Sequence, residues 1–284
     1  MKKIGIVTDS HSSISPEQAS ILGVHVLPMP FMIDGADYLE GVTLTREQFF
    51  AHQRAGAEIS TSQPSPADVL ALWDELLLEY ETLLYMPISS GLSGSCQTAM
   101  GLAEDEPYQG RVFVVDNGRI ATPLHRSILD AIELIDKGFT AAQCKEALEQ
   151  ARDELTIYIA VQTLEYLKKG GRISATTAAV GTLLNIKPIL QLTTGKLESY
   201  KKARGMMKAK EIMLESIRSD LPSALPTRSP AATYTCWPPA APPRRRPRSG
   251  SRRSRQPSPA CLCFTMICPW ACPAIPARVR WASA

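Results

Sequence analysis

The sequence lacks any apolar run long enough to cross a membrane, since none of its apolar stretches reaches the roughly 18 residues that a transmembrane helix needs. The first residues, MKKIGIVTDS, hold too few apolar side chains before Asp9 for a signal peptide, so we expect a cytoplasmic protein. The glycine-rich patterns G-x-x-x-x-G-K-[ST] and G-x-G-x-x-G are also missing, so nucleotide binding has no specific support.

The last part of the chain lacks Asp, Glu, Lys, His and Asn altogether. From Leu221 to Ala284 it holds instead 13 of the 22 prolines, 10 of the arginines and 5 of the 7 cysteines. Because all 28 acidic residues precede this tail, residues 1–220 carry a net charge of −7, although the whole chain has +3. The body is therefore an ordinary acidic chain, and the apparent basicity belongs to the tail.

Four interpretations of residues 221–284 stay open: a disordered Pro/Arg-rich linker, a nucleic-acid-binding arm, a cysteine-based metal site, or translation in a shifted reading frame. The arginines would bind phosphate without sequence specificity. The cysteines form no C-x-x-C pair and have no histidine nearby, which argues against zinc. Pro, Arg, Ala, Ser, Cys and Trp are what GC-rich DNA encodes out of frame. We therefore favour an aberrant, disordered tail, and we expect neither a metal ion nor nucleic acid as a partner.

The body alternates between predicted strands and predicted helices. Short apolar runs predict strands at residues 3–8, 24–29, 82–88 and 111–115. Amphipathic stretches predict helices at residues 45–54, 65–80, 93–103, 121–137 and 140–153. This alternation predicts an α/β fold, with a parallel sheet flanked by helices.

A second domain is expected over residues 151–220, after an N-terminal α/β domain over residues 1–150. Its predicted elements are a strand at 156–162, a short helix at 164–169, an apolar helix at 174–184, a hairpin around Thr194-Gly195-Lys196, and a helix at 205–218. Because the tail of residues 221–284 follows directly, this second α/β domain is expected to be truncated.

Two hydroxyl-rich loops stand before predicted helices. They are SSGLSGS at Ser89–Ser95 and STSQPSP at Ser60–Pro66. Glycines let the backbone approach a ligand, and the free N–H groups of a helix N-terminus favour an anion. Either loop alone is better explained as a capped turn without a ligand. Two such loops in one half of the chain favour a hydroxyl-lined anion pocket.

Other features have ordinary structural explanations. The segment Gly91–Ser95 lacks the last glycine of the hydrolase pattern G-x-S-x-G, and none of the four histidines stands in an obvious base position. A serine hydrolase that uses Ser89–Ser95 is nevertheless kept as the alternative function. The basic segment Lys168–Ser174 is typical of a helix C-cap, and the cluster Lys201, Lys202 and Arg204 is typical of a solvated sheet edge.

Taken together, the motifs resemble those of the DegV family of bacterial fatty-acid-binding proteins. The resembling segments occur in the family's order: Thr8–Ser10, Thr61–Ser65, Pro87–Ser95, Val114–Asn117, Lys168–Ser174 and Leu184–Leu190. Each segment is weak evidence alone, but the set is specific and spans residues 1 to about 220.

This resemblance implies a two-domain α/β protein that buries a long-chain fatty acid, such as palmitate, between its domains. It implies that Thr61 and Ser93 bind the carboxylate, with Ser62, Ser90 and Gly94 as further ligand-binding candidates in the same loops. Such proteins are not enzymes by themselves and need no cofactor. Some present the acid to a separate ATP-dependent fatty acid kinase, and Arg172, Lys202 and Arg204 would suit docking of that partner.

The sequence departs from the family at its C-terminal end, which usually carries a His-Thr-Gly-Pro-Gly turn. If each codon is read from the third base of one triplet and the first two of the next, residues 274–280 permit His-Thr-Gly-Pro-Gly-Ala. In the same frame Trp270-Ala271 and Trp281-Ala282 each give Gly. This agreement supports the interpretation that a frameshift occurs near residue 221.

Overall fold

The computed structural model describes residues 2–173, 185–193, 195–220, 233–236 and 262–267. The chain divides into two compact units. The first contains Met1–Leu155, and the second contains Thr156–Thr193 and Leu197–Cys268. Gly195 and Lys196 group with the first unit. The division after Leu155 lies near the boundary predicted at residue 150, where a helical region is followed by a new strand.

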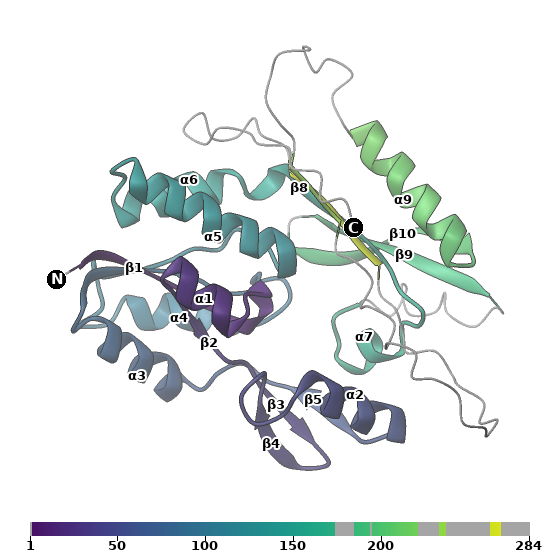
Figure 1. The fold of residues 1–284 in the computed structure, drawn as a ribbon, viewed down its shortest axis with the longest axis horizontal. Helices are drawn as coiled ribbons and strands as arrows, with labels where there is room; N and C mark the ends of the chain where they lie inside the picture. Colours follow the sequence, from purple (N-terminus) through teal and green to yellow (C-terminus); the bar gives the residue numbers. More distant parts are fainter. Residues whose placement is uncertain (1, 174–184, 194, 221–232, 237–261, 268–284) are drawn as a thin grey trace. The chain divides into compact units, whose positions relative to one another are not determined.

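The first unit is built on a parallel sheet with the strand order β2-β1-β6-β7. The strands are β1 (Lys2–Asp9), β2 (Val24–Leu27), β6 (Tyr80–Met86) and β7 (Val112–Val114). The helices around it are α1 (Pro16–Leu22), α3 (Pro66–Leu76), α4 (Ser95–Ala103), α5 (Ala121–Asp136) and α6 (Ala141–Gln150), with the 3-10 turns η1 (Ser10–Ser12) and η2 (Arg152–Glu154). The predicted parallel α/β fold is confirmed (Figure 1).

Local sequence signals explain where most of these helices begin. Ser15 and Thr140 each form a capping box, in which the hydroxyl accepts from the third helical N–H and a glutamine side chain reaches back. Ser65 caps α3 in the simpler way, with Pro66 in the first helical position. The N-cap Gly94 of α4 makes no side-chain capping bond, and neither does the N-cap Ile120 of α5.

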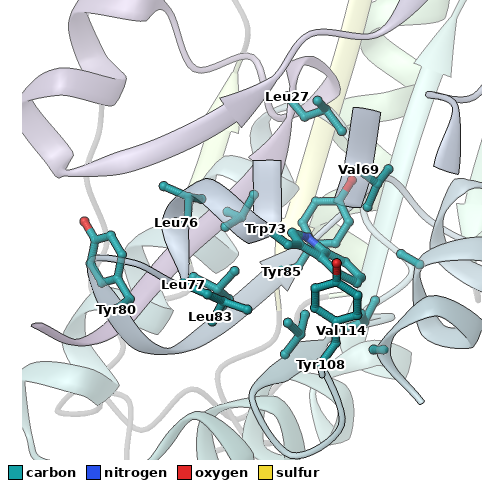
Figure 2. Packing of buried hydrophobic residues seen from close by; sticks show 14 of the residues in the cluster. Leu27, Val69, Trp73, Leu76, Leu77, Tyr80, Leu83, Tyr85, Tyr108 and Val114 are labelled. Carbon is teal, nitrogen blue, oxygen red and sulfur yellow. The ribbon is translucent and has the colours of Figure 1, made fainter. Parts of the chain in front are cut away.

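The alternation of side chains along the strands divides the core of the first unit into two layers. One layer packs β1 and β6 against α3 and α4, and it includes Val7, Trp73, Leu83, Tyr85 and Cys96. In Figure 2 the indole of Trp73 lies between the rings of Tyr85 and Tyr108, with ring centroids 5.9 and 5.4 Å away. The other layer packs the opposite face against α1, α5 and α6, and it includes Ile6, Leu84, Met86, Leu124 and Ile128.

A small antiparallel sheet interrupts the parallel pattern between β2 and α3. Its strands are β3 (Pro30–Ile33), β4 (Ala36–Leu39) and β5 (Ile59–Thr61), and α2 (Arg46–Ala55) lies beside it (Figure 1). Sequence analysis predicted α2 but missed this sheet. The dipeptide Asp34-Gly35 was the available signal, because both residues have positive φ (49° and 83°) and form a two-residue hairpin turn.

The second unit is built on a sheet with the strand order β10-β9-β8-β12-β11. Its elements are β8 (Leu155–Ala160), α7 (Glu165–Lys169), β9 (Ile186–Thr193), β10 (Lys196–Arg204), α9 (Met206–Asp220), β11 (Thr233–Cys236) and β12 (Leu262–Ile267). A small core unites Tyr158, Ile189, Ala209 and Met213. The apolar helix predicted at 174–184 lies outside the described residues.

Within the tail, the structure differs from the expectation of disorder at two short segments. Strands β11 and β12 pair antiparallel, with Thr233 opposite Ile267. Both segments are free of proline and arginine and rich in Thr, Tyr, Phe and Ile, which favour strands. The other residues of the tail lie outside those described, so the frameshift interpretation stays a prediction.

Candidate functional site

Buried polar side chains join the carboxyl ends of the adjacent strands β1 and β6. The Thr8 hydroxyl donates to the Met86 carbonyl at 2.7 Å. The fully buried Asp9 carboxylate accepts from the backbone N–H of Ile88 at 2.7 Å and of His11 at 3.0 Å. Asp9 therefore ties the chain leaving β6 to the chain leaving β1, at the sheet edge where ligands of parallel α/β proteins bind.

The serine-rich turn Ser89–Ser95 follows β6 and is held by Asp116, which comes just after β7. Ser90 donates to Asp116 twice, from its hydroxyl at 2.5 Å and from its backbone N–H at 3.3 Å. Arg152 completes the arrangement with an ion pair to Asp116 at 2.7 Å. Burial alone would raise the pKa of Asp116, but the Ser90 hydroxyl and the Arg152 charge outweigh it, so the pKa lies below its ordinary value. The carboxylate is thus ionised and anchors the turn.

The hydroxyl of Ser93 is arranged differently from that of Ser90. Ser93 Oγ accepts from the backbone N–H of Ser95 at 3.3 Å and from the Ser95 hydroxyl at 2.9 Å. It donates to no partner among the described residues. Ser93 is only partly buried, whereas Ser95 is 5% exposed in the first turn of α4. Ser93 therefore offers a hydroxyl proton beside a helix N-terminus.

The second hydroxyl-rich loop reaches the same helix through Gln63. Thr61 ends β5 with an exposed side chain, and Ser62 follows it, also exposed. The Gln63 amide donates to Thr98 of α4 at 3.1 Å. A methyl group placed on Gly94 would lie 2.7 Å from the Gln63 oxygen, so glycine is what allows this close approach. Gln63 thus links the loop that contains Thr61 to the turn that contains Ser93.

Among the described residues, the contacts of Ser93 include hydrogen-bond donors and no general base. The recorded partners of Ser93 in the described structure both belong to Ser95, and no histidine is among them. His25 Nε2 contacts the hydroxyl of Tyr80 on β6, and His11 Nδ1 lies 3.5 Å from Oδ1 of Asp9. The described residues include no group of three or more His, Cys, Asp or Glu side chains that would hold a metal ion. No helix in the described parts is long and apolar enough to cross a membrane.

The basic residues predicted to dock a partner lie in the second unit. Lys202 and Arg204 are exposed on one side of β10, and Ala203 between them is buried. Arg172 is exposed just after α7, where it donates to the Gly170 carbonyl. The predicted C-cap at this helix is confirmed by Gly170, whose N–H bonds to the last turn of α7.

Comparison with known proteins identifies the family. The profile of the DegV family of uncharacterised proteins matches residues 3–228 of the chain. This chain belongs to the DegV family. A DegV domain-containing protein of Deinococcus radiodurans is 36% identical over 216 residues, 76% of each chain. One from Staphylococcus aureus is 33% identical over 204 residues, 72% of each chain. Most of the Pro- and Arg-rich tail lies outside the range matched to the DegV profile.

Solved DegV structures share the fold. A fatty-acid-binding DegV family protein from Thermus thermophilus is 36% identical, with a TM-score of 0.72 over 82% of this chain and 81% of that one. A fatty-acid-binding DegV family protein from Streptococcus agalactiae is 28% identical, with a TM-score of 0.71 over 82% of each chain. The resemblance inferred from the six sequence motifs is therefore confirmed.

Sequence reasoning predicted hydroxyl residues as ligand-binding candidates but missed the residues that position their loops. Asp9 and Asp116 were named only within segments that resemble the DegV family, without any role. Gln63 and Ser95 were part of quoted motifs without any role. Their roles depend on partners that lie elsewhere in the sequence or on the direction of a hydroxyl hydrogen bond. Neither can be predicted from the composition of a short motif.

Proposed function

We propose that this protein binds a long-chain fatty acid, such as palmitate, and holds its carboxylate with Thr61 and Ser93. The observation that carries the proposal is the Ser93 hydroxyl, which accepts twice from Ser95 and keeps its proton for a ligand. A carboxylate accepts hydrogen bonds without donating any, so it suits this site and the N-terminus of α4. The similarity to DegV proteins described as fatty-acid-binding supports the same ligand.

The energetics assign different tasks to the two ends of such a ligand. A palmitate chain has about fourteen methylenes, and their burial is worth roughly 11 kcal/mol at ~0.8 kcal/mol each, before the cost of ordering the chain. The polar residues then need only replace the water lost by the carboxylate and fix its orientation. Where the acyl chain lies, including the expected burial between two domains, stays a prediction.

The remaining ligand-binding candidates have distinct prospects. Gly94 gives access to the start of α4 and admits Gln63. Ser62 is exposed next to Thr61, and its backbone N–H bonds to Pro30 of the small sheet. Ser90 already donates its proton to Asp116, so direct donation to a carboxylate would require that bond to break.

Lipid extraction and binding titration test the proposal. The purified protein should release a long-chain fatty acid on extraction, and the delipidated protein should bind palmitate saturably. Ser93→Ala and Thr61→Val should each weaken palmitate binding about ten- to hundredfold, because each loses a hydrogen bond to a charged group. Thr82→Val is the matched control, since Thr82 also lies on a strand but bonds to Lys3 at the other end of the sheet. Absence of saturable binding by the unaltered protein would refute the proposal.

We further propose that the protein catalyses no reaction alone, in contrast to the alternative of a serine hydrolase. A hydrolase needs a base within reach of its nucleophile, and the Ser93 contacts described above include none. Hydrolysis of a long-chain p-nitrophenyl ester by the purified protein, lost in Ser93→Ala, would favour the hydrolase instead.

Presentation of the acid to an ATP-dependent kinase in the cytoplasm is the finer part of the proposal. Arg172, Lys202 and Arg204 are the residues proposed to dock that partner. The pair Lys202→Glu and Arg204→Glu should lower acyl phosphate formation by a DegV-dependent kinase and leave palmitate binding unchanged. Lys208→Glu is the control, because Lys208 is an exposed lysine paired with Glu211 on α9.

A further inference from the structure

Ser95 is the buried partner of the residue that we assign to the carboxylate. It is the first residue of α4. The neighbouring Cys96 and Ala99 are 0% and 1% exposed, in the core layer between the sheet and the helices α3 and α4. This packing fixes the position of the Ser95 backbone. Both polar groups of Ser95 then point to one acceptor, because its N–H and its hydroxyl donate to Ser93 Oγ at 3.3 and 2.9 Å.

Because Ser93 Oγ already accepts two hydrogen bonds, it can form a third only by donating its proton. A hydroxyl carries one proton and about two acceptor lone pairs. When Ser95 occupies both acceptor positions, the free capacity of Ser93 is donation. A donated bond also polarises the hydroxyl that accepts it, so the Ser95 bond strengthens the bond that Ser93 makes to a ligand.

The neighbouring serines of the turn show that this arrangement is particular to Ser93. Ser89 donates to the Gly195 carbonyl at 3.1 Å, and Ser90 donates to Asp116. The hydroxyl protons of Ser89 and Ser90 are therefore both donated to acceptors of the protein itself. Within the described structure, Ser93 is the serine of this turn whose acceptor side is occupied and whose donor side is open.

We propose that Ser95 is a positioning residue that makes the site selective for a carboxylate over an uncharged head group. This inference rests on the proposed function, in which Ser93 binds the acid. Ser95 does not touch the ligand. It sets the direction of the Ser93 proton, so its removal frees a lone pair of Ser93 and lets the hydroxyl rotate. Selectivity then falls, because an alcohol can donate a hydrogen bond to that lone pair, whereas a carboxylate has no proton to donate.

The test compares palmitate with hexadecanol, which has the same chain length and an uncharged head group, on the delipidated full-length protein. Ser95→Ala should weaken palmitate binding about three- to tenfold, the value of one ordinary hydrogen bond. Hexadecanol binding should change less than about twofold on the same argument. Ser95→Thr keeps the hydroxyl and should keep the selectivity. In the double variant Ser93→Ala/Ser95→Ala, palmitate affinity should equal that of Ser93→Ala alone, because Ser95 acts through Ser93.

Controls separate this role from a general effect on folding. Ser216→Ala removes another buried serine with two hydrogen bonds, from Tyr200 and to the Ile212 carbonyl, and should leave selectivity unchanged. If Ser95→Ala does not fold, Ser95→Cys replaces it, since a thiol is a weak donor of similar size. Equal weakening of both ligands, no weakening, or additive losses in the double variant would overturn the proposal for Ser95. No saturable palmitate binding by the unaltered protein would instead overturn the proposed function, and the role of Ser95 with it.

Discussion

Replacement of Asp116 by asparagine should destabilise the first unit, because this carboxylate joins three segments. It accepts from Ser90 Oγ at 2.5 Å, from Arg152 at 2.7 Å, and from the N–H groups of Ser90 and Gly118 at 3.3 and 3.4 Å. One carboxylate oxygen accepts from Ser90 Oγ and Arg152, and the other accepts from the two backbone N–H groups. Asparagine has a single oxygen, so it can satisfy the donors on only one of these two sides. Its amide group then faces donors on the other side.

The size of the loss follows from these contacts. A hydrogen bond to a charged group is worth about 1.5–3 kcal/mol and a neutral one about 1 kcal/mol. The side chain of Asp116 is 12% exposed and that of Arg152 is 31% exposed, so solvent screens the pair only in part. We expect Asp116→Asn to lower the free energy of unfolding by about 2–3 kcal/mol and the melting temperature by roughly 4–12 °C.

The dependence on pH identifies the carboxylate as the cause. Because the pKa of Asp116 is lowered in the folded protein, its ionised form stabilises the fold at neutral pH. This contribution is present above the ordinary pKa of 3.8 and disappears as pH falls through the lowered value. The difference between the protein and Asp116→Asn should therefore be constant near neutral pH and shrink in acid.

Urea unfolding, followed by circular dichroism, measures these differences. Arg152→Met and the double variant complete a cycle that isolates the ion pair. The matched control is Glu211→Gln, which removes an exposed carboxylate (63% exposed) from its pair with Lys208 and should change stability by less than about 0.5 kcal/mol. A loss below about 0.5 kcal/mol in Asp116→Asn, or a coupling energy near zero with Arg152, would refute this reasoning.

Further predictions concern other parts of the chain. Gly5→Ala should cost about 1–3 kcal/mol in urea unfolding, because its methyl group would lie 2.8 Å from the Tyr80 ring. Gly101→Ala in α4, where nothing lies within 4 Å, should instead stabilise by about 0.5–1 kcal/mol, and equal effects would contradict this. Burial is the main cause that raises the pKa of the Cys96 thiol, to about 12, so iodoacetamide should label its peptide only after denaturation. Rapid native labelling, read by mass spectrometry, would be the contrary result. Resequencing near codon 220 should reveal a shifted frame, whereas an intact frame that encodes the same tail would show the frameshift interpretation to be wrong.

The sequence alone determined those features that depend on neighbours in the chain. The starts of α1, α3 and α6 follow from serine or threonine caps whose partners lie three residues away. Apolar runs and amphipathic stretches predicted the parallel sheet and the helices α3, α4, α5 and α6, because strand and helix periods appear within a few residues, but the short helix α1 was missed. The hydroxyl loops around Thr61 and Ser93 were recognised for the same reason, as short motifs with a defined order.

Only the tertiary structure decided how the site is assembled. Gln63 contacts α4 across 35 residues of sequence, and Asp116 holds Ser90 across 26. The different roles of Ser90 and Ser93 depend on which neighbour takes each hydroxyl proton. Such bonds join segments that the fold brings together. Chemically identical serines are therefore distinguished only by the direction of the hydrogen bonds that packing imposes on them.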